Sequence, residues 1–223
     1  ATVPLIMQRF STYAKTMKLA FISTPEVKET SNIEREYLKG DQRKYFVPCP
    51  CCGEYITFEW ECDSEFVENG KAGIYYELNE NSELVADSVG YVCPKCNQFF
   101  TDQKKSEMLL AGEWRATAIA KDPEYTSYHL SSLYGPTYMF GWFKYVKQYL
   151  EANPPGQPRD EKLHQTFVNL VLGETYEPRG QSIDATSIQK NIRPYKVGIV
   201  PERQSIMDGN GRIVLLTFGS DLN

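Results

Sequence analysis

Two short cysteine-containing stretches decide the fold of this chain, Cys49-Pro50-Cys51-Cys52-Gly53 and Cys93-Pro94-Lys95-Cys96. Each contains the pattern Cys-Pro-x-Cys, and 40 residues separate them. Such a knuckle lets two thiolates on one tight turn reach the same metal ion. Two knuckles together predict one tetrahedral zinc site, with the ligands Cys49, Cys52, Cys93 and Cys96.

The other two cysteines, Cys51 and Cys62, leave alternatives open. Cys51 and Cys52 are neighbours and cannot both face one ion comfortably, so we interpret Cys51 as a bystander. Cys62 is interpreted as an ordinary thiol. A different interpretation makes the four predicted ligands reduced core thiols or disulfides, but a cytoplasmic chain disfavours disulfides. Four cysteine ligands leave no open position for water, so the predicted zinc is structural.

The segment that carries the knuckles has a β pattern. Apolar and aromatic residues predict short strands at 45–47, 56–60, 74–76 and 91–92. Residues 63–88 are acidic and rich in Asn, Ser and Gly, which indicates a solvated loop with one hairpin. The knuckles are therefore expected to lie on hairpins of a β insertion.

Both helices and strands are expected around this insertion, which makes the predicted fold class α+β. Residues 18–25 form an apolar run closed by Ser-Thr-Pro and predict a buried strand. Ser31 and Glu34 make a capping box for a helix at 32–39, and Gly40 can close it in a left-handed conformation. Further helices are expected at 101–111, 138–152 and 163–171, the last stopped by Gly173, and extended pieces at 114–118 and 128–130.

The C-terminal part has a different pattern. Residues 174–205 show no clear period and are interpreted as a linker. Asp208-Gly209-Asn210-Gly211 is a strong turn signal, and residues 213–218 form an apolar β run. We expect a new sheet to begin there.

The charge balance limits the possible partners. With 24 Lys and Arg against 29 Asp and Glu the net charge is -5, so nucleic-acid contact must come from a local patch. One such patch is the cluster Arg35, Lys39, Arg43 and Lys44, which can contact DNA backbone or be a solvated face. No apolar run approaches the roughly 18 residues of a membrane span, which favours a soluble, cytoplasmic protein.

No nucleotide site of its own is evident in the chain. The phosphate-loop pattern G-x-x-x-x-G-K-[ST] is absent, so if an ATPase is involved its phosphate loop lies upstream. The chain opens without Met and stops just after an apolar run, and we interpret both ends as cuts within a longer polypeptide.

Several stretches, taken in order, carry a family resemblance. They are Phe21-Ile22-Ser23-Thr24-Pro25, Ile33-Glu34-Arg35, the two knuckles, Ala111-Gly112-Glu113-Trp114-Arg115, His129-Leu130-Ser131-Ser132-Leu133-Tyr134, and Leu216-Thr217-Phe218-Gly219-Ser220-Asp221. In this order they resemble the large terminase subunit of tailed bacteriophages, in the GpA (lambda-like) class. The resemblance covers nearly the whole chain and implies an interior fragment of an ATP-driven DNA-packaging motor that is also a metal-dependent endonuclease.

The resemblance also implies a domain organisation. Residues 1–44 would end a P-loop-type ATPase domain, and 45–100 would be a zinc-ribbon-like insertion. Residues 101–175 would complete the ATPase region, 176–205 would be the interdomain linker, and 206–223 would start an RNase H-like nuclease. By the same resemblance Ser23 and Thr24 would couple ATP hydrolysis to movement, and Asp221 would be a catalytic carboxylate that binds the nuclease metal.

Cofactors and partners follow from the same resemblance. They are ATP, Mg or Mn for the nuclease, double-stranded DNA, the small terminase subunit, the portal protein and further copies of the chain, in the host cytoplasm and without a membrane. The fragment alone is expected to be inactive. Two other hypotheses compete: a free-standing zinc-ribbon module that binds DNA or protein, and a structural connector with no ligand beyond zinc.

Overall fold

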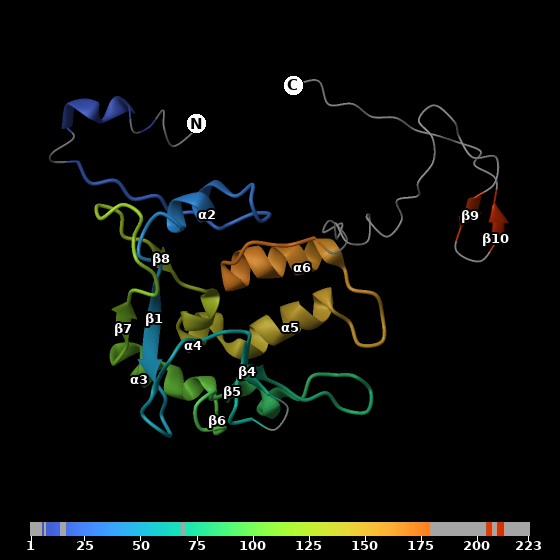
Figure 1. Cartoon of the computed structure of the whole chain (residues 1–223). Helices are drawn as coiled ribbons and strands as arrows, with labels where there is room; N and C mark the ends of the chain where they lie inside the picture. The colour runs from blue at the N-terminus through green and yellow to red at the C-terminus, as the bar shows by residue number, and fades with distance from the viewer. Residues whose placement is uncertain are drawn as a thin grey trace. The chain divides into compact units, whose positions relative to one another are not determined.

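A computed structural model describes residues 6, 8–13, 17–67, 70–178, 204–206 and 209–211. Residues 1–178 form one compact unit and residues 179–223 form a second. The first unit mixes helices with two small sheets (Figure 1), which agrees with the mixed class predicted from the sequence. None of the helices in the described ranges has the length and apolar character needed to cross a membrane.

The elements of the first unit are short. In chain order they are η1 (Ser11–Tyr13), α2 (Asn32–Tyr37), β1 (Arg43–Pro48), β2 (Tyr55–Ile56), β3 (Glu61–Asp63), β4 (Lys71–Tyr75), η2 (Ala86–Ser88), β5 (Gly90–Val92), β6 (Phe99–Phe100), η3 (Asp102–Lys104), α3 (Lys105–Leu110), β7 (Glu113–Arg115), β8 (Tyr128–His129), η4 (Ser132–Tyr134), α4 (Thr137–Phe140), α5 (Trp142–Ala152), α6 (Glu161–Phe167) and the π-helical turn η5 (Val168–Leu172).

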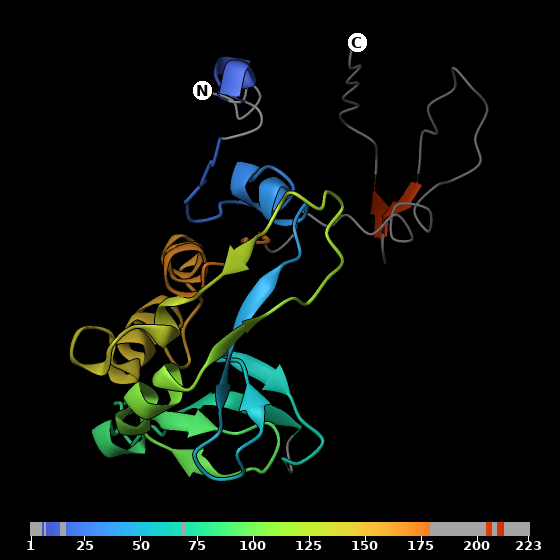
Figure 2. The ribbon, with the colours of Figure 1, turned by 90° about the vertical axis from the view of Figure 1, so that its left-hand side faces the viewer.

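The strands form two sheets. In the first, β1 pairs antiparallel with β2 and β7 and parallel with β8. In the second, the order is β3-β4-β5-β6, with all neighbours antiparallel. Figure 2 shows β1 running from the α2 end of the unit down to the second sheet. The β1–β2 hairpin carries one knuckle and the β5–β6 hairpin carries the other, so both lie at the same end of the unit.

An aromatic core joins the sheets to the helices. Phe58 packs against Tyr134 and Trp142, with ring centroids 4.9 and 5.3 Å apart. Tyr91 also contacts Trp142, at 5.7 Å. The Phe58 N–H donates a hydrogen bond to the Tyr134 hydroxyl (2.8 Å), and the Trp142 side chain is fully buried. Such burial stabilises by about 2 kcal/mol or more per large side chain, so the β insertion and the helices stabilise each other.

The helix pair α5 and α6 lies side by side beneath α2 (Figure 1). Trp142, Tyr145 and Val146 are buried, which is the 3.6-residue spacing of one helix face. The helix predicted at 138–152 is interrupted at Gly141, which is extended (ψ 144°), so the structure has α4 and α5 instead. Asp102 accepts a hydrogen bond from the Trp142 N–H (3.2 Å) at this break, so its carboxylate satisfies a backbone donor at the start of α5.

The prediction of a buried strand at 18–25 is wrong. Residues 17–26 pair with no strand in the described part of the chain, and the Ile22 side chain is 94% exposed. An apolar run becomes a strand only where a neighbouring segment supplies partners for its backbone N–H and C=O groups. The sequence of the run does not show whether such a neighbour is present.

The structure confirms the predicted N-cap of helix α2 and contradicts the predicted left-handed conformation of Gly40. The Ser31 hydroxyl accepts the Glu34 N–H at 3.5 Å, as expected of the N-cap. Gly40 does not adopt a left-handed conformation. A Cβ at Gly40 would lie 2.5 Å from the Ser127 hydroxyl, so glycine is required there by close packing and not by a helix cap.

In the second unit, β9 (Gln204–Ile206) pairs antiparallel with β10 (Gly209–Gly211). Gly209 lies opposite Ile206, so the prediction of a turn across 208–211 is wrong for 209–211, which belong to a strand. Glycine and asparagine can enter a strand when a hairpin partner is adjacent, although they disfavour it. The predicted linker at 176–205 lies largely outside the described residues, and the apolar run at 213–218 lies wholly outside them.

Candidate metal centre

The two knuckles bring four thiols together. The sulfur atoms of Cys49, Cys52, Cys93 and Cys96 all lie within 4.8 Å of one another, and those of Cys49 and Cys96 are 3.9 Å apart. In a tetrahedral zinc site with bonds of about 2.3 Å, the sulfurs are about 3.8 Å apart. A disulfide would require about 2.05 Å. All six cysteines are free, so the four sulfurs form a set that could hold one metal ion.

The backbones of the knuckles repeat each other. The Gly53 N–H donates to the Cys49 carbonyl (2.9 Å), and the Asn97 N–H donates to the Cys93 carbonyl (3.0 Å). Gly53 and Asn97 are both left-handed, with φ of 76° and 57°. The return bonds match as well, Cys49 N–H to Glu54 O at 2.9 Å and Cys93 N–H to Gln98 O at 3.0 Å. The same tight turn therefore presents its two sulfurs on each hairpin.

Backbone amides point at the sulfurs within each turn. The Cys51 N–H lies 3.4 Å from the Cys49 sulfur, and the Lys95 N–H lies 3.4 Å from the Cys93 sulfur. A donor beside a sulfur favours its thiolate form, which is the form that binds metal. The third residue of each knuckle thus contributes its amide, while the side chains of Cys51 and Lys95 are exposed.

The acidity of the thiols reflects this arrangement. Burial opposes ionisation of Cys49, but the N–H groups of Cys52 and Cys51 outweigh burial, and the pKa of Cys49 is lowered. Burial raises the pKa of Cys93 and of Cys96. A divalent cation would stabilise the fully ionised set, since metal binding releases thiol protons.

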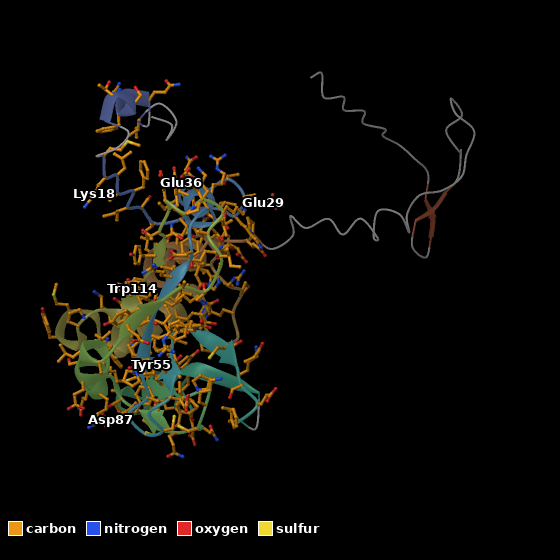
Figure 3. The ribbon with its side chains drawn as sticks, turned by 60° about the vertical axis from the view of Figure 1, so that its left-hand side comes forward. Lys18, Glu29, Glu36, Tyr55, Asp87 and Trp114 are labelled. Atoms are coloured by element: carbon orange, nitrogen blue, oxygen red, sulfur yellow. The ribbon has the colours of Figure 1, made fainter. Side chains whose placement is uncertain are left out.

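The basic cluster at Arg35, Lys39, Arg43 and Lys44 is not a patch of unpaired cations. Three of its members form ion pairs with carboxylates: Lys39–Glu36 (2.8 Å), Arg43–Asp41 (2.6 Å) and Lys44–Glu59 (3.0 Å). Arg35 donates to the Asn32 side chain. Figure 3 shows Glu36 at the α2 end of the unit, away from Tyr55 and Asp87 at the sheet end. A phosphate would have to compete with these carboxylates for the three paired cations.

The remaining predicted site residues are not gathered with the cysteines. Ser23 and Thr24 are exposed, and the Ser23 hydroxyl donates to the Thr24 carbonyl at 3.1 Å. Asp221 lies outside the described residues. His129, which belongs to one of the stretches that carry the resemblance, hydrogen bonds to the Leu172 and Gly173 carbonyls.

Asn97 is a feature of the centre that the sequence interpretation missed. It stands after Cys96 as Gly53 stands after Cys52, and asparagine is among the few residues enriched in left-handed conformations. The signal was therefore present in the printed sequence. The amides of Cys51 and Lys95 were equally predictable once both turns were recognised as the same.

Comparisons with known proteins divide the chain in two. Residues 1–114 match the family model of the phage terminase large subunit gpA, ATPase domain, and residues 125–221 match that of the terminase large subunit gpA, endonuclease domain. The terminase large subunit of Escherichia phage lambda is 26% identical over 194 residues, which cover 81% of this chain and 28% of that protein. The terminase large subunit of Enterobacteria phage P21 is 24% identical over 216 residues, which cover 89% of this chain and 29% of that protein. No solved structure matches.

Proposed function

We propose, because the chain belongs to the family of phage terminase large subunits of the gpA type, that it is part of an ATP-driven DNA-packaging motor and metal-dependent endonuclease. The observation that carries the proposal is the order of the two family matches, ATPase first and endonuclease second. The chain spans less than a third of the length of the two relatives. The activities proposed here are therefore those of a longer protein.

The division of labour along the chain stays a prediction. We place the end of a P-loop-type ATPase at 1–44, a zinc-ribbon-like insertion at 45–100, and the first strands of an RNase H-like nuclease at 206–223. The family matches instead change from ATPase to endonuclease between residues 114 and 125. The helices at 137–172, which we assigned to the ATPase region, fall within the endonuclease match.

The cysteine centre is proposed to bind a structural zinc ion. Its support is the sulfur spacing and the repeated turn geometry described above. Four thiolates complete a tetrahedral shell, so no position remains for a reactive water. The chain's own residues hold the two hairpin tips together and exclude solvent from the Cys49 and Cys93 side of the cluster.

The aromatic core joins the insertion to later parts of the chain. Phe58 and Tyr91 pack on Tyr134 and Trp142, which lie outside residues 45–100. The motor, the free-standing module and the connector hypotheses all accommodate this packing, because all four residues belong to the chain. Only the motor hypothesis accounts for the two family matches.

Cofactors and partners are proposed for the whole protein: ATP, Mg or Mn, double-stranded DNA, the small terminase subunit, the portal protein and further copies, in the host cytoplasm.

The basic cluster is proposed to contact DNA phosphates. Phosphate oxygens would then have to replace the carboxylates of Glu36, Asp41 and Glu59 as partners of the cations. Replacing Arg35, Lys39, Arg43 and Lys44 by Gln should lower the salt slope of DNA binding by about one per lost contact. An unchanged slope would favour the solvated face.

The decisive experiment uses the full-length protein and Asp221→Ala. A nuclease of this kind holds two divalent ions about 4 Å apart with several carboxylates, so losing one should abolish cleavage. ATP hydrolysis should remain. Asp87→Ala, which removes an exposed carboxylate outside the proposed nuclease segment, is the control and should cut normally. Cleavage by Asp221→Ala in Mg²⁺ or Mn²⁺ would remove Asp221 from the nuclease site.

A further inference from the structure

A groove of about 370 Å³ runs along one face of the helix pair α5 and α6. Residues 153–160 join the end of α5 to the start of α6, and the two helices run antiparallel (Figure 1). The Tyr149 ring of α5 packs against His164 and Phe167 of α6, with ring centroids 6.2 and 5.5 Å apart, which sets the register of the two helices. The floor of the groove consists of buried side chains, those of Tyr145, Phe167 and Val171.

The two walls of the groove have the same length, seven residues or about two helical turns. Lys144, Gln148 and Glu151 of α5 form one wall, and Leu163, Thr166 and Leu170 of α6 and η5 form the other. Because the helices are antiparallel, Lys144 lies level with Leu170, Gln148 with Thr166, and Glu151 with Leu163. The groove therefore has a charge and an exposed leucine at each end, and polar groups in the middle.

Polar groups of the groove lack partners among the residues that the structure describes. Tyr145 is only 3% exposed, and its hydroxyl has no hydrogen-bond partner there. Leaving a buried hydroxyl unpaired costs roughly 1–3 kcal/mol. Lys144 and Glu151 form no ion pair in the same part of the chain. These groups would gain partners if another molecule covered the face.

We propose that this face pairs with the same face of a second copy of the chain, about a two-fold axis that crosses both helices at the level of Gln148 and Thr166. In such an isologous contact, a residue that meets a second residue in the partner is itself met by that second residue. Lys144 then meets Glu151 of the partner subunit, and Glu151 meets Lys144 of the partner subunit. The leucines at the two ends of the other wall meet in the same way.

The charges favour a second copy over a different kind of partner. A basic segment in the groove would be repelled by Lys144 and an acidic segment by Glu151, whereas an antiparallel copy of the α5 wall neutralises both. Gln148 and Thr166 lie at the axis, and their side-chain oxygens can accept the Tyr145 O–H. The inference goes beyond the proposed function, because this pairing needs neither nucleotide nor DNA. A ring would instead repeat a head-to-tail contact between different surfaces.

The test measures self-association of the full-length protein by analytical ultracentrifugation, over a range of concentrations and without nucleotide, DNA or the small subunit. The wild type should form dimers that dissociate on dilution. Lys144→Glu and Glu151→Lys should each raise the dimer Kd about tenfold, because each turns both ion pairs into like-charge contacts. Lys147→Glu is the matched control and should leave the Kd unchanged, since Lys147 is exposed on α5 but does not line the groove.

Two rescues separate a lost contact from a misfolded chain. An equal mixture of the two single variants should pair as tightly as the wild type, because position 144 of one chain then faces an opposite charge at position 151 of the other in both contacts. The double variant Lys144→Glu with Glu151→Lys should also recover the wild-type Kd. Failure of both rescues would overturn the two-fold contact.

Leu170→Gln tests the apolar part of the face and should also raise the Kd about tenfold, since it removes apolar surface from the contact. Leu110→Gln changes an even more exposed leucine outside the groove and should have no effect. A wild type that stays monomeric at every concentration would overturn the inference. So would dimers that tolerate both single charge changes, or a face that Lys144→Glu shows to bind the small subunit instead. ATP hydrolysis and DNA cleavage, measured separately, decide the proposed function whichever result is found.

Discussion

The two knuckles have the same backbone but different surroundings. Residues 49–53 and 93–97 make matching hydrogen bonds, and each places a left-handed residue after its second cysteine. Cys49 and Cys93 are both buried, but Cys96 is half-buried whereas Cys52 is exposed, and nothing lies within 4 Å of a Cβ built on Gly53. The comparison teaches that the turn is a local property, while the burial of each ligand is set by the rest of the fold.

Packing behind the second knuckle explains the difference. Its hairpin contributes Tyr91 and Phe100, which pack against Trp142 at 5.7 and 6.1 Å. The Ser64 hydroxyl also donates to the Pro94 carbonyl at 2.6 Å. The chain then continues into α3, where Lys105 is buried against the same Trp142 ring, 5.3 Å from its centroid. The second knuckle should therefore contribute more to stability than the first.

The largest expected effect comes from replacing one cysteine of the proposed metal centre, either in the first knuckle or in the second. Cys93→Ser and Cys52→Ser should both reduce bound zinc from about one per chain to near zero. Structural zinc contributes on the order of 10 kcal/mol in small modules, so both variants should lose several kcal/mol of unfolding free energy. Cys93→Ser should lose more, because it also leaves a polar hydroxyl in a buried place. Metal analysis and denaturant unfolding measure this, and full zinc content in either variant would contradict the centre.

The next effect concerns Lys105, which is buried behind the second knuckle, and it depends on pH. Burial lowers the pKa of Lys105 to about 8, below its usual 10.5. The unfolded chain then binds more protons between these values, so the Lys105 contribution to the unfolding free energy rises as pH increases from about 8 to 10.5. Lys105→Met should lack this contribution and be more stable at pH 7 by up to about 3 kcal/mol. Denaturant unfolding of both proteins across this range measures the difference, which should shrink as pH rises. A constant difference would be evidence against a neutralised lysine.

A smaller effect separates the left-handed residues of the two turns. Gly53→Ala should destabilise by about 1 kcal/mol, because a Cβ strains a positive φ even where space is open. Asn97→Gly should change the unfolding free energy by less than about 0.5 kcal/mol, since both residues tolerate φ near 57°. Thermal unfolding of the zinc-loaded proteins compares them. If Gly53→Ala and Asn97→Gly lost the same unfolding free energy, the two turns would not both be left-handed in solution.

The smallest effect is expected at the third knuckle position. Cys51→Lys copies the residue that the second knuckle has at Lys95, and both side chains are exposed. The variant should keep one zinc per chain and stay within about 0.5 kcal/mol of the wild type, as surface substitutions usually do. Its thiol labelling under native conditions should fall. Loss of zinc would instead make Cys51 a ligand.

The printed sequence carried enough information to predict the two cysteine turns, because the geometry of each turn depends on neighbouring residues. The spacing within each knuckle specifies the turn, whereas the approach of Cys49 to Cys96 (3.9 Å) depends on how the two hairpins pack in the folded chain. The stop at Gly173 and the cap at Ser31 were predictable for the same reason, since each involves groups within about five residues. Local bonds and local dihedral preferences determine such features.

Only the tertiary structure decided which contacts form between residues that are far apart in the chain. The packing of Gly40 on Ser127, the pairing of Lys44 with Glu59 and the bond from Asn169 to Pro25 each depend on a residue that no local pattern identifies. The absence of a strand at residues 17–26 belongs to the same class, because a strand requires a neighbour that the run cannot supply. The sequence by itself therefore determined the cysteine turns, the helix cap at Ser31 and the helix stop at Gly173. Burial, ion pairing and the bond between Asn169 and Pro25 were decided by contacts formed once the chain had folded, because their energies depend on which distant groups exclude water together.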